Sequence, residues 1–271
     1  MGWLKGRPGV QRAVTTADRA RLVNRPMPFA LREWRRSAAT VRYRPRGAGA
    51  DVLLRHGTSD LDILDEIFGR RLYEVPAPVR AALAQAEGPL RVLDLGAHVG
   101  LFGAWAFGEW DGAQVTAVEA DPANAELLRR TIEAAGRGSR WTLLPVVAAA
   151  RDGRVSFRAG EFAESHLGDL GEPAEARDVL PLMEGSDLVK MDIEGGEWPI
   201  LADPRLPTLS TRALVLEYHA RGCPGRDPAT TAATVLHAAG FHTGEIRGAP
   251  AGAGMLWAWR DVAVRAPRES A

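Results

Sequence analysis

Apolar runs and amphipathic stretches alternate along most of the chain. The apolar runs predict strands at residues 92–94, 114–119, 141–147, 186–192, 213–218, 242–246 and 255–260, with a small added strand at 154–158. The stretches between them predict helices at residues 101–107, 122–135, 173–183 and 228–239, with Asp121 and Asp227 as expected N-caps. Strands that alternate with helices indicate an α/β fold, in which ligands bind beyond the carboxyl ends of the strands. The last two strands are expected to form an antiparallel edge.

The pattern before the first of these strands is mainly helical. Residues 16–23 and 29–39 are helical candidates, and residues 41–44 and 51–54 predict short strands. A further helix is expected to begin at Ser59 or Asp60, with an apolar stripe at Leu61, Leu64, Ile67 and Phe68, and another to span residues 79–86. These patterns divide the chain into a basic N-terminal helical extension, a helical lid or cap, a cofactor-binding core and a tail, at residues 1–50, 51–88, 89–265 and 266–271.

The composition is ordinary for a soluble globular protein, with 46% hydrophobic and 25% charged residues. The formal net charge is zero, but residues 1–50 hold twelve Lys or Arg against only Asp18 and Glu33, so this segment carries about +10. We expect these arginines to form a solvated face; a docking surface for an acidic carrier protein, phosphate or nucleic acid is the alternative. Cys223 is the only cysteine, which excludes an internal disulfide and favours a cytoplasmic location. No apolar run reaches the length of about 18 residues that a membrane helix needs.

The stretch V-L-D-L-G-A-H-V-G at residues 92–100 is the most informative part of the sequence. An apolar strand ending in Asp94 turns through Gly96 and Gly100 into an apolar helix, a pattern typical of nucleotide-binding turns. Three residues separate these glycines, whereas one separates the first two of the dinucleotide fingerprint, so the turn suits a ligand without a pyrophosphate, such as S-adenosylmethionine (SAM). Glu119, 25 residues after Asp94, is the candidate for the ribose hydroxyls. Each of these residues also has a purely structural interpretation, as a cap, a turn or a strand-end carboxylate.

A second dense group of polar residues follows the predicted strand 186–192. Asp192, Glu194 and Glu197 lie within six residues of one another, beside Lys190. Like charges this close are costly unless they are paired or used. Asp192 is the first candidate for a role at a methyl-transfer centre, and His219, at the end of the next strand, is the second candidate for the base. A structural role stays open for His219 and is favoured for Glu197.

Several of these motifs together resemble the FkbM family of SAM-dependent methyltransferases. The matching pieces, between about residues 57 and 219, are T-S-D-L-D-I-L-D-E-I-F with Tyr73, D-L-G-A-H-V-G, V-E-A-D-P-A-N, D-L-V-K-M-D-I-E-G-G-E-W-P-I-L and L-E-Y-H. The resemblance implies a Rossmann-like class I methyltransferase fold: a seven-stranded, mostly parallel sheet flanked by helices, here with an N-terminal mainly helical appendage. It also implies methylation, commonly of a hydroxyl on a sugar or secondary metabolite. The chain departs from the family pattern at His98, where members often have Asn, and both side chains can form hydrogen bonds.

The sequence therefore predicts a SAM-dependent O-methyltransferase that acts on a hydroxyl of a small-molecule natural product or sugar. N-methylation of a small molecule, RNA methylation and a non-catalytic SAM-binding module are the alternatives. The predicted catalytic residues are Asp192, His219 and Glu194, and the predicted cofactor-binding residues are Asp94, Gly96, His98, Gly100, Glu119, Ala120 and Asp192. No metal is predicted, although Asp192, Glu217 and His219 would be the ligands of a divalent cation. The expected partner is the small-molecule acceptor, and the basic N-terminus could dock an acidic partner or carrier protein. No membrane is expected, nucleic acid is disfavoured, and a homo-oligomer stays open.

Overall fold

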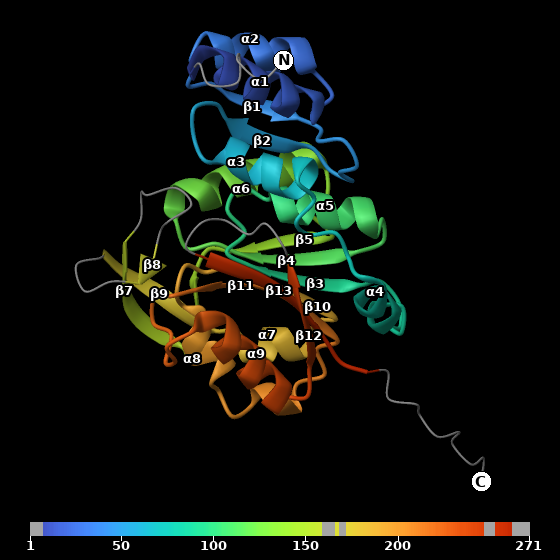
Figure 1. Ribbon diagram of the computed structural model, residues 1–271, viewed down its shortest axis with the longest axis vertical. Coiled ribbons are helices and arrows are strands. Elements are labelled where there is room, and N and C mark those ends of the chain that lie inside the picture. Colours follow the sequence, from blue (N-terminus) through green and yellow to red (C-terminus); the bar gives the residue numbers. More distant parts are fainter. Residues whose placement is uncertain (1–7, 159–165, 168–171, 247–252, 262–271) are drawn as a thin grey trace.

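A seven-stranded sheet forms the centre of the structure (Figure 1). In spatial order its strands are β12 (His242–Ile246), β13 (Ala253–Trp259), β11 (Ala213–His219), β10 (Leu188–Met191), β3 (Arg91–Leu95), β4 (Gln114–Val118) and β5 (Trp141–Leu144). Only β13 runs antiparallel to its neighbours. The structure, a computed structural model, describes residues 8–158, 166–167, 172–246 and 253–261. The predicted α/β class, the seven-stranded and mostly parallel sheet and the antiparallel last pair are confirmed.

Helices cover both faces of this sheet (Figure 1). One layer contains α4 (Ala77–Leu83), α5 (Leu101–Glu109) and α6 (Pro122–Ala135), with α3 (Asp60–Leu64) and the π-helical turn η1 (Asp65–Gly69). The opposite layer contains α7 (Leu180–Glu184), α8 (Glu197–Leu201), the 3-10 turn η2 (Leu206–Thr208) and α9 (Pro228–Ala238). The expected N-caps are confirmed, because Asp121 accepts hydrogen bonds from the N–H groups of Ala123 and Asn124, and Asp227 accepts one from that of Thr230.

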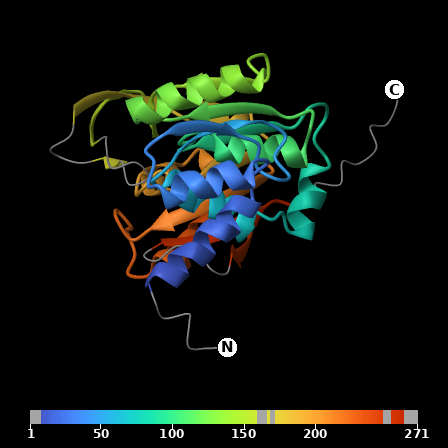
Figure 2. The ribbon, with the colours of Figure 1, turned by 90° about the horizontal axis from the view of Figure 1, so that it is seen from above.

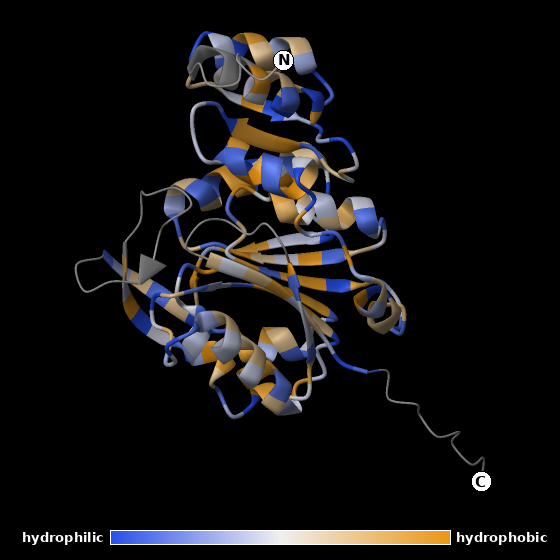
Figure 3. Cartoon of the chain, viewed as in Figure 1, coloured by the Kyte–Doolittle hydropathy of each residue, from blue (hydrophilic) through white to orange (hydrophobic). Residues whose placement is uncertain are grey.

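Burial on both faces explains the continuous apolar runs of the central strands. Successive residues of a strand point to opposite faces. In β3, for example, Val92 packs into the layer of α5 and α6, whereas Leu93 packs into the layer of α7, α8 and α9. Figure 3 shows the resulting hydrophobic colour along the central strands. A strand of this kind has no polar face, so its polar residues are confined to its ends.

The N-terminal region lies over the layer of α5 and α6 (Figures 1 and 2). It consists of α1 (Pro8–Arg21), α2 (Pro26–Trp34) and an antiparallel pair of strands, β1 (Thr40–Tyr43) and β2 (Val52–Arg55). The Gly49 N–H donates to the Ala104 carbonyl of α5 at 2.9 Å, and a side chain on Gly49 would clash with the Phe107 carbonyl. The Leu53 N–H donates to the Thr131 hydroxyl of α6 at 3.2 Å. Backbone contacts therefore hold β2 and the chain before it against the core.

The surface of α1 and α2 carries the large exposed apolar side chains of the described chain. Met27, Leu31 and Trp34 lie at helical spacing on α2, and Val14 lies on α1. Some arginines of this region are neutralised within the protein: Arg42 and Arg44 pair with Asp51, and Arg19 pairs with Asp62. The docking of an acidic partner here stays a prediction. No helix in the described ranges is long and apolar enough to cross a lipid bilayer.

Two predicted elements are wrong, and both lie beside a small second sheet. Its strands are β6 (Val147–Ala149), β9 (Glu172–Asp178), β7 (Gly153–Arg158) and β8 (His166–Leu167). The strand expected at 141–147 divides at Pro145, which has no N–H for a sheet, so that β5 and β6 join different sheets. The helix expected at 173–183 is instead β9 followed by α7. Tertiary packing overrides the local pattern here, because β9 pairs with β7 and buries Ala176 in a small cluster with Val147 and Phe157.

The helix expected at 29–39 begins and ends earlier than predicted. Pro26 occupies the first turn of α2, where its missing N–H is not needed. The helix ends at Trp34, and Arg36 adopts a left-handed φ of 52°. The other N-terminal predictions correspond to α1, β1, β2, α4 and the continuous segment of α3 and η1.

Candidate functional site

The carboxyl ends of the central strands bring the predicted site residues to one rim. Lys190 lies beside Asp94 in the register of β10 and β3, so both side chains point to the same face of the sheet. Asp192 follows two residues after Lys190 and therefore shares this face. Met191 is paired with Leu216, which places Glu217 beside Asp192. The expected convergence of strand-end acids is present on the face that α5 and the N-terminal region cover.

Lys190 ties the ends of β3 and β10 together. Its Nζ donates to the Gly96 carbonyl at 2.6 Å and lies 3.5 Å from Asp94 Oδ1 and 3.4 Å from Asp192 Oδ2. Burial would lower the pKa of Lys190, but the charges of Asp192, Asp94 and Glu217 outweigh it and raise the pKa. Burial raises the pKa of Asp94 to about 6 even though Lys190 opposes the shift. Among the described residues no donor forms a hydrogen bond with either Asp94 oxygen, so this buried carboxylate retains unused acceptor capacity.

The glycines of the turn after β3 have different roles. Gly96 has φ of 78°, and a Cβ on it would fall well inside contact distance of the Asp192 carbonyl oxygen. Only glycine allows the ends of β3 and β10 to lie this close. Gly100 has φ of 94°, and a Cβ there would lie 2.6 Å from Leu128 and 2.8 Å from the Trp141 ring. Gly96 thus shapes the rim, whereas Gly100 lets α5 pack closely on its neighbours.

Glu119 connects the turns that follow β3 and β4. Its Oε2 accepts the His98 N–H at 2.7 Å and its Oε1 accepts the Asp121 N–H at 2.8 Å. Burial raises the pKa of Glu119 to about 7, against the effect of these two hydrogen bonds. Each carboxylate oxygen can accept a second hydrogen bond. Ala120, the next residue, is half-buried and packs against the small cluster around Val147.

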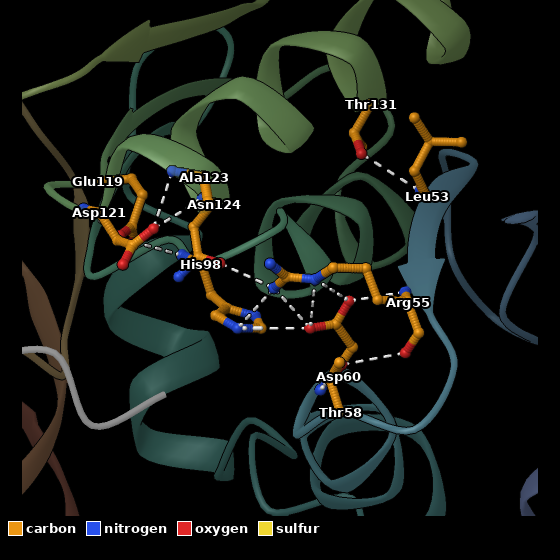
Figure 4. Close-up of polar contacts among 10 residues, drawn as sticks. All are labelled: Leu53, Arg55, Thr58, Asp60, His98, Glu119, Asp121, Ala123, Asn124 and Thr131. Atoms are coloured by element: carbon orange, nitrogen blue, oxygen red, sulfur yellow. Dashed lines mark hydrogen bonds and ion pairs between the residues drawn. The ribbon is translucent and has the colours of Figure 1, made fainter. Parts of the chain in front are cut away.

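The His98 side chain points away from Glu119 toward an arginine of the N-terminal region (Figure 4). His98 has φ of 51°, and its Nε2 lies 3.4 Å from Arg55 Nη2 and 3.5 Å from Asp60 Oδ1. Arg55 Nη2 also donates to Asp60 Oδ1 and to Asn124 Oδ1, each at 2.7 Å. Burial lowers the pKa of His98 to about 4, so the ring is neutral. These four side chains connect β2, α3, the turn after β3 and α6.

Arg55 and Asn124 had no role in the sequence analysis, and Asp60 was only a candidate cap. Instead of capping α3, the Asp60 carboxylate accepts the Arg55 backbone N–H at 2.8 Å and pairs with its guanidinium. Asn124 belongs to the V-E-A-D-P-A-N motif, which was the available signal for it. Arg55 had none, because its partner Asn124 lies 69 residues away in the chain.

Asp192, Glu194 and His219 form a compact polar cluster at the ends of β10 and β11. One ligand-type atom from each side chain lies within 4.8 Å of the other two. His219 Nε2 is 3.2 Å from Glu194 Oε2, and His219 Nδ1 is 3.0 Å from Glu197 Oε1. Burial would lower the pKa of His219, but the hydrogen bond and charge of Glu197, with the charges of Glu194 and Asp192, raise it to about 9. The ring is therefore an imidazolium at neutral pH in the absence of a bound cation.

Glu197 has the structural role that the sequence analysis favoured for it. It is fully buried, and its Oε1 accepts the backbone N–H groups of Ile193 and Gly195 at 3.2 and 3.1 Å. The same oxygen orients the His219 ring. Glu194 lies inside this turn with a left-handed φ of 56°, a conformation that non-glycine residues rarely adopt. The turn therefore holds both Glu194 and His219 in defined positions.

The segment between β2 and β3 adds two groups that the sequence analysis did not assign. Burial, and the charges of Asp192 and Glu217 after it, raise the pKa of Tyr73 well above its usual value. The Tyr73 ring packs edge-on against Phe102 of α5, with centroids 5.2 Å apart. Burial also raises the pKa of Glu66, in η1, to about 7, and that of Glu217 to about 9, and the Asp192 charge contributes to both shifts. Burial and the crowding of carboxyl groups therefore favour the protonated, uncharged forms of Glu66 and Glu217 on this side of the rim.

The chain matches no known protein-family model and no curated protein sequence. Among solved structures it is similar to a SAM-dependent methyltransferase from Agrobacterium tumefaciens, with 14% identity over 82% of this chain and 70% of that chain and a TM-score of 0.45. It is also similar to a precorrin-6y C5,15-methyltransferase from Geobacter metallireducens, with 16% identity, 67% and 85% coverage and a TM-score of 0.42. A third is M. jannaschii TYW2 in complex with AdoMet, with 11% identity, 82% and 85% coverage and a TM-score of 0.42. Because likenesses this distant do not fix a reaction, the proposed function rests on the residues of the rim.

Proposed function

We propose that the protein is a SAM-dependent methyltransferase of the FkbM type that methylates a hydroxyl group of a small molecule. The observation that carries this proposal is the meeting of the D-L-G-A-H-V-G turn, Glu119 and Asp192 at the rim of the sheet. In α/β sheets this rim is where ligands bind. The motif resemblance noted in the sequence supports the same function.

The residues of the rim fit the parts of SAM. Asp94 retains buried carboxylate oxygens without hydrogen-bond donors in the described chain, which suits an ammonium group near the turn. Gly96 lets the ends of β3 and β10 lie close together, which brings Asp94 and Asp192 to one rim. Glu119 has lone pairs left for two ribose hydroxyls. When bound, SAM supplies an electrophilic methyl group on a positively charged sulfur.

The chain's part in the reaction is to orient the acceptor and to receive its proton. A bond forms between the acceptor oxygen and the methyl carbon, the bond from this carbon to sulfur breaks, and the hydroxyl proton leaves for a base. Asp192 is the proposed group for this role, because its carboxylate is partly exposed at the rim, with Oδ2 3.4 Å from Lys190 Nζ. General-base assistance of this kind is worth about 10²- to 10⁴-fold in rate. In the absence of a bound cation, Glu197 and Glu194 hold His219 as an imidazolium, which supports the site electrostatically.

The polar groups of the rim help to distinguish between the alternative acceptors, nucleic acids and amines. The carboxyl groups of Asp192, Glu194 and Glu217 line the rim, which disfavours a nucleic acid, whose phosphates bind to basic surfaces. An amine acceptor remains the second candidate, because a protonated amine would be attracted to the same carboxylates. Methylation of matched alcohol and amine acceptors decides between oxygen and nitrogen.

The first test is calorimetric titration of the full-length protein with S-adenosylhomocysteine (SAH). We expect micromolar binding that Asp94→Asn and Glu119→Gln weaken by about tenfold or more, since each removes an acceptor of a charge-assisted hydrogen bond. Asp111→Asn is the matched control, because its side chain is 92% exposed and lies away from the rim. Absence of SAH binding to the wild-type protein, or equal effects in the control, would contradict the proposal. Turnover with a panel of hydroxylated acceptors then tests the reaction.

A further inference from the structure

We propose that Asp192, Glu194 and His219 bind a divalent transition-metal ion such as Mn²⁺ beside the acceptor position. Binding of the ion does not depend on the proposed methyltransferase function; only its role in the reaction does. The sequence analysis predicted no metal, and its candidate set contained Glu217 in place of Glu194. The structure replaces that set, because the three groups that approach one another within 4.8 Å are Asp192, Glu194 and His219.

The geometry of these three groups suits one ion. Ligand atoms about 2.1 Å from a metal lie about 3.0 to 4.2 Å from one another, depending on the angle between them. His219 Nε2 and Glu194 Oε2 are already 3.2 Å apart. Two carboxylates and one imidazole leave several coordination positions open, and this mixed oxygen and nitrogen set is typical of first-row divalent ions.

The His219 ring is oriented in the way that metal ligands commonly are. Its Nδ1 faces the Glu197 carboxylate at 3.0 Å, and Glu197 is in turn fixed by the N–H groups of Ile193 and Gly195. Metal-binding histidines usually donate their second ring N–H to a carboxylate in this manner. The arrangement leaves Nε2 directed at Glu194, where the ion would lie.

Glu217 is a further carboxyl group that lies beside the cluster. Its side chain is 10% exposed and next to the His219 ring. The His219 ring is its closest ion-pair partner, with Nε2 3.9 Å from Oε1. The Lys190 ammonium donates instead to the Gly96 carbonyl. An ion at the cluster would lie close to this carboxyl group and favour its ionised form.

An ion at this position would act on the acceptor. It would hold the acceptor hydroxyl next to Asp192 and, as a Lewis acid, favour the loss of its proton. This role makes the rate of methyl transfer dependent on the ion, whereas SAH binding at Asp94 and Glu119 would not require it.

The test uses the full-length protein, stripped of metal with a chelator and titrated with Mn²⁺ alone. Free Mn²⁺ is followed by electron paramagnetic resonance and the heat of binding by calorimetry. We expect one site per chain. The affinity should weaken by more than about tenfold in Glu194→Gln and in His219→Asn, because the loss of a metal ligand costs at least as much as the loss of a residue that forms a hydrogen bond with a ligand. Glu74→Gln, at a carboxylate that is 63% exposed, is the matched control and should bind like the wild type.

SAH titration of the same variants separates a lost ligand from a lost fold. Retained SAH binding by Glu194→Gln, together with lost Mn²⁺ binding, supports the site. Absence of a stoichiometric Mn²⁺ site in the wild type, or unchanged affinity in Glu194→Gln, would overturn it. Unchanged affinity in His219→Asn would overturn the assignment of the imidazole as a ligand. Mn²⁺ binding without SAH binding would leave the metal site standing and refute the methyltransferase, and the reverse result would refute the metal site alone.

Discussion

Gly96→Ala is the substitution that tests the rim most directly. Gly96 combines a left-handed φ of 78° with a position in which any Cβ would clash with the Asp192 carbonyl oxygen. The left-handed backbone costs an L-residue about 1–2 kcal/mol. A carbon and a carbonyl oxygen need about 3.3 Å, so one strand end must also move by about 1 Å or more. Such overpacking costs a further 1–3 kcal/mol or so.

Substitutions at two other glycines separate the cost of the left-handed backbone from the cost of the steric clash. Gly136 has φ of 64° but open space around a Cβ, so Gly136→Ala measures the backbone cost alone. Gly112 has open space and no positive φ, so Gly112→Ala should stay within about 0.5 kcal/mol of the wild type. Urea unfolding of the three variants gives the free energies of unfolding, and SAH titration gives the state of the site. We expect Gly96→Ala alone to lose SAH binding. An unfolding free energy and SAH affinity equal to those of Gly136→Ala would refute the close approach of β3 and β10.

Three further predictions concern the groups around the rim. Arg55→Ala leaves the fully buried Asp60 carboxylate without its cation and should cost about 3–5 kcal/mol in urea unfolding, whereas Arg71→Ala, which breaks only the exposed pair with Glu74, should cost less than about 1 kcal/mol. Burial raises the pKa of Glu119 to about 7, and only its ionised form accepts the ribose hydroxyls fully, so SAH affinity should fall as the pH drops from 8 to 6; a profile unchanged by Glu119→Gln would contradict this. Asp192→Asn should slow methyl transfer by about 10²- to 10⁴-fold in single-turnover assays, and full activity would exclude Asp192 from the reaction centre.

The fold was predictable where local pattern and burial agree. The central strands are apolar on both faces and end in polar residues, so their positions follow from the sequence alone. Asp121 and Gly136 likewise bound α6 by local chemistry, a side-chain cap and a left-handed residue. The helix predicted at 173–183 was wrong because the secondary structure of this segment depends on partner strands. β9 is a strand only because β7 and β6 lie beside it. Nothing in its local periodicity indicates that pairing.

The same distinction applies to the site. Asp94, Glu119, Asp192 and His219 could be predicted because each ends or follows a strand, and parallel strands end at the same rim. The residues that contact them could not be predicted in this way. The bond from Arg55 to Asn124 joins residues 69 positions apart, and the tie from Lys190 to the Gly96 carbonyl joins residues 94 positions apart.

The N-terminal region contributes to the site through such long-range contacts. His98 lies in the turn after β3, yet its ring is placed by Arg55 and Asp60, which precede the first central strand (Figure 4). The His98 N–H of the same turn donates to Glu119. The position of β2 therefore affects the position of the carboxylate proposed for the ribose. A turn of this kind is conformationally demanding, since both His98 and Gly96 have positive φ. The region before β3 is therefore a structural part of the proposed cofactor site, and weakening its contact with α6 should weaken SAH binding even though Arg55 itself lies outside the glycine motif.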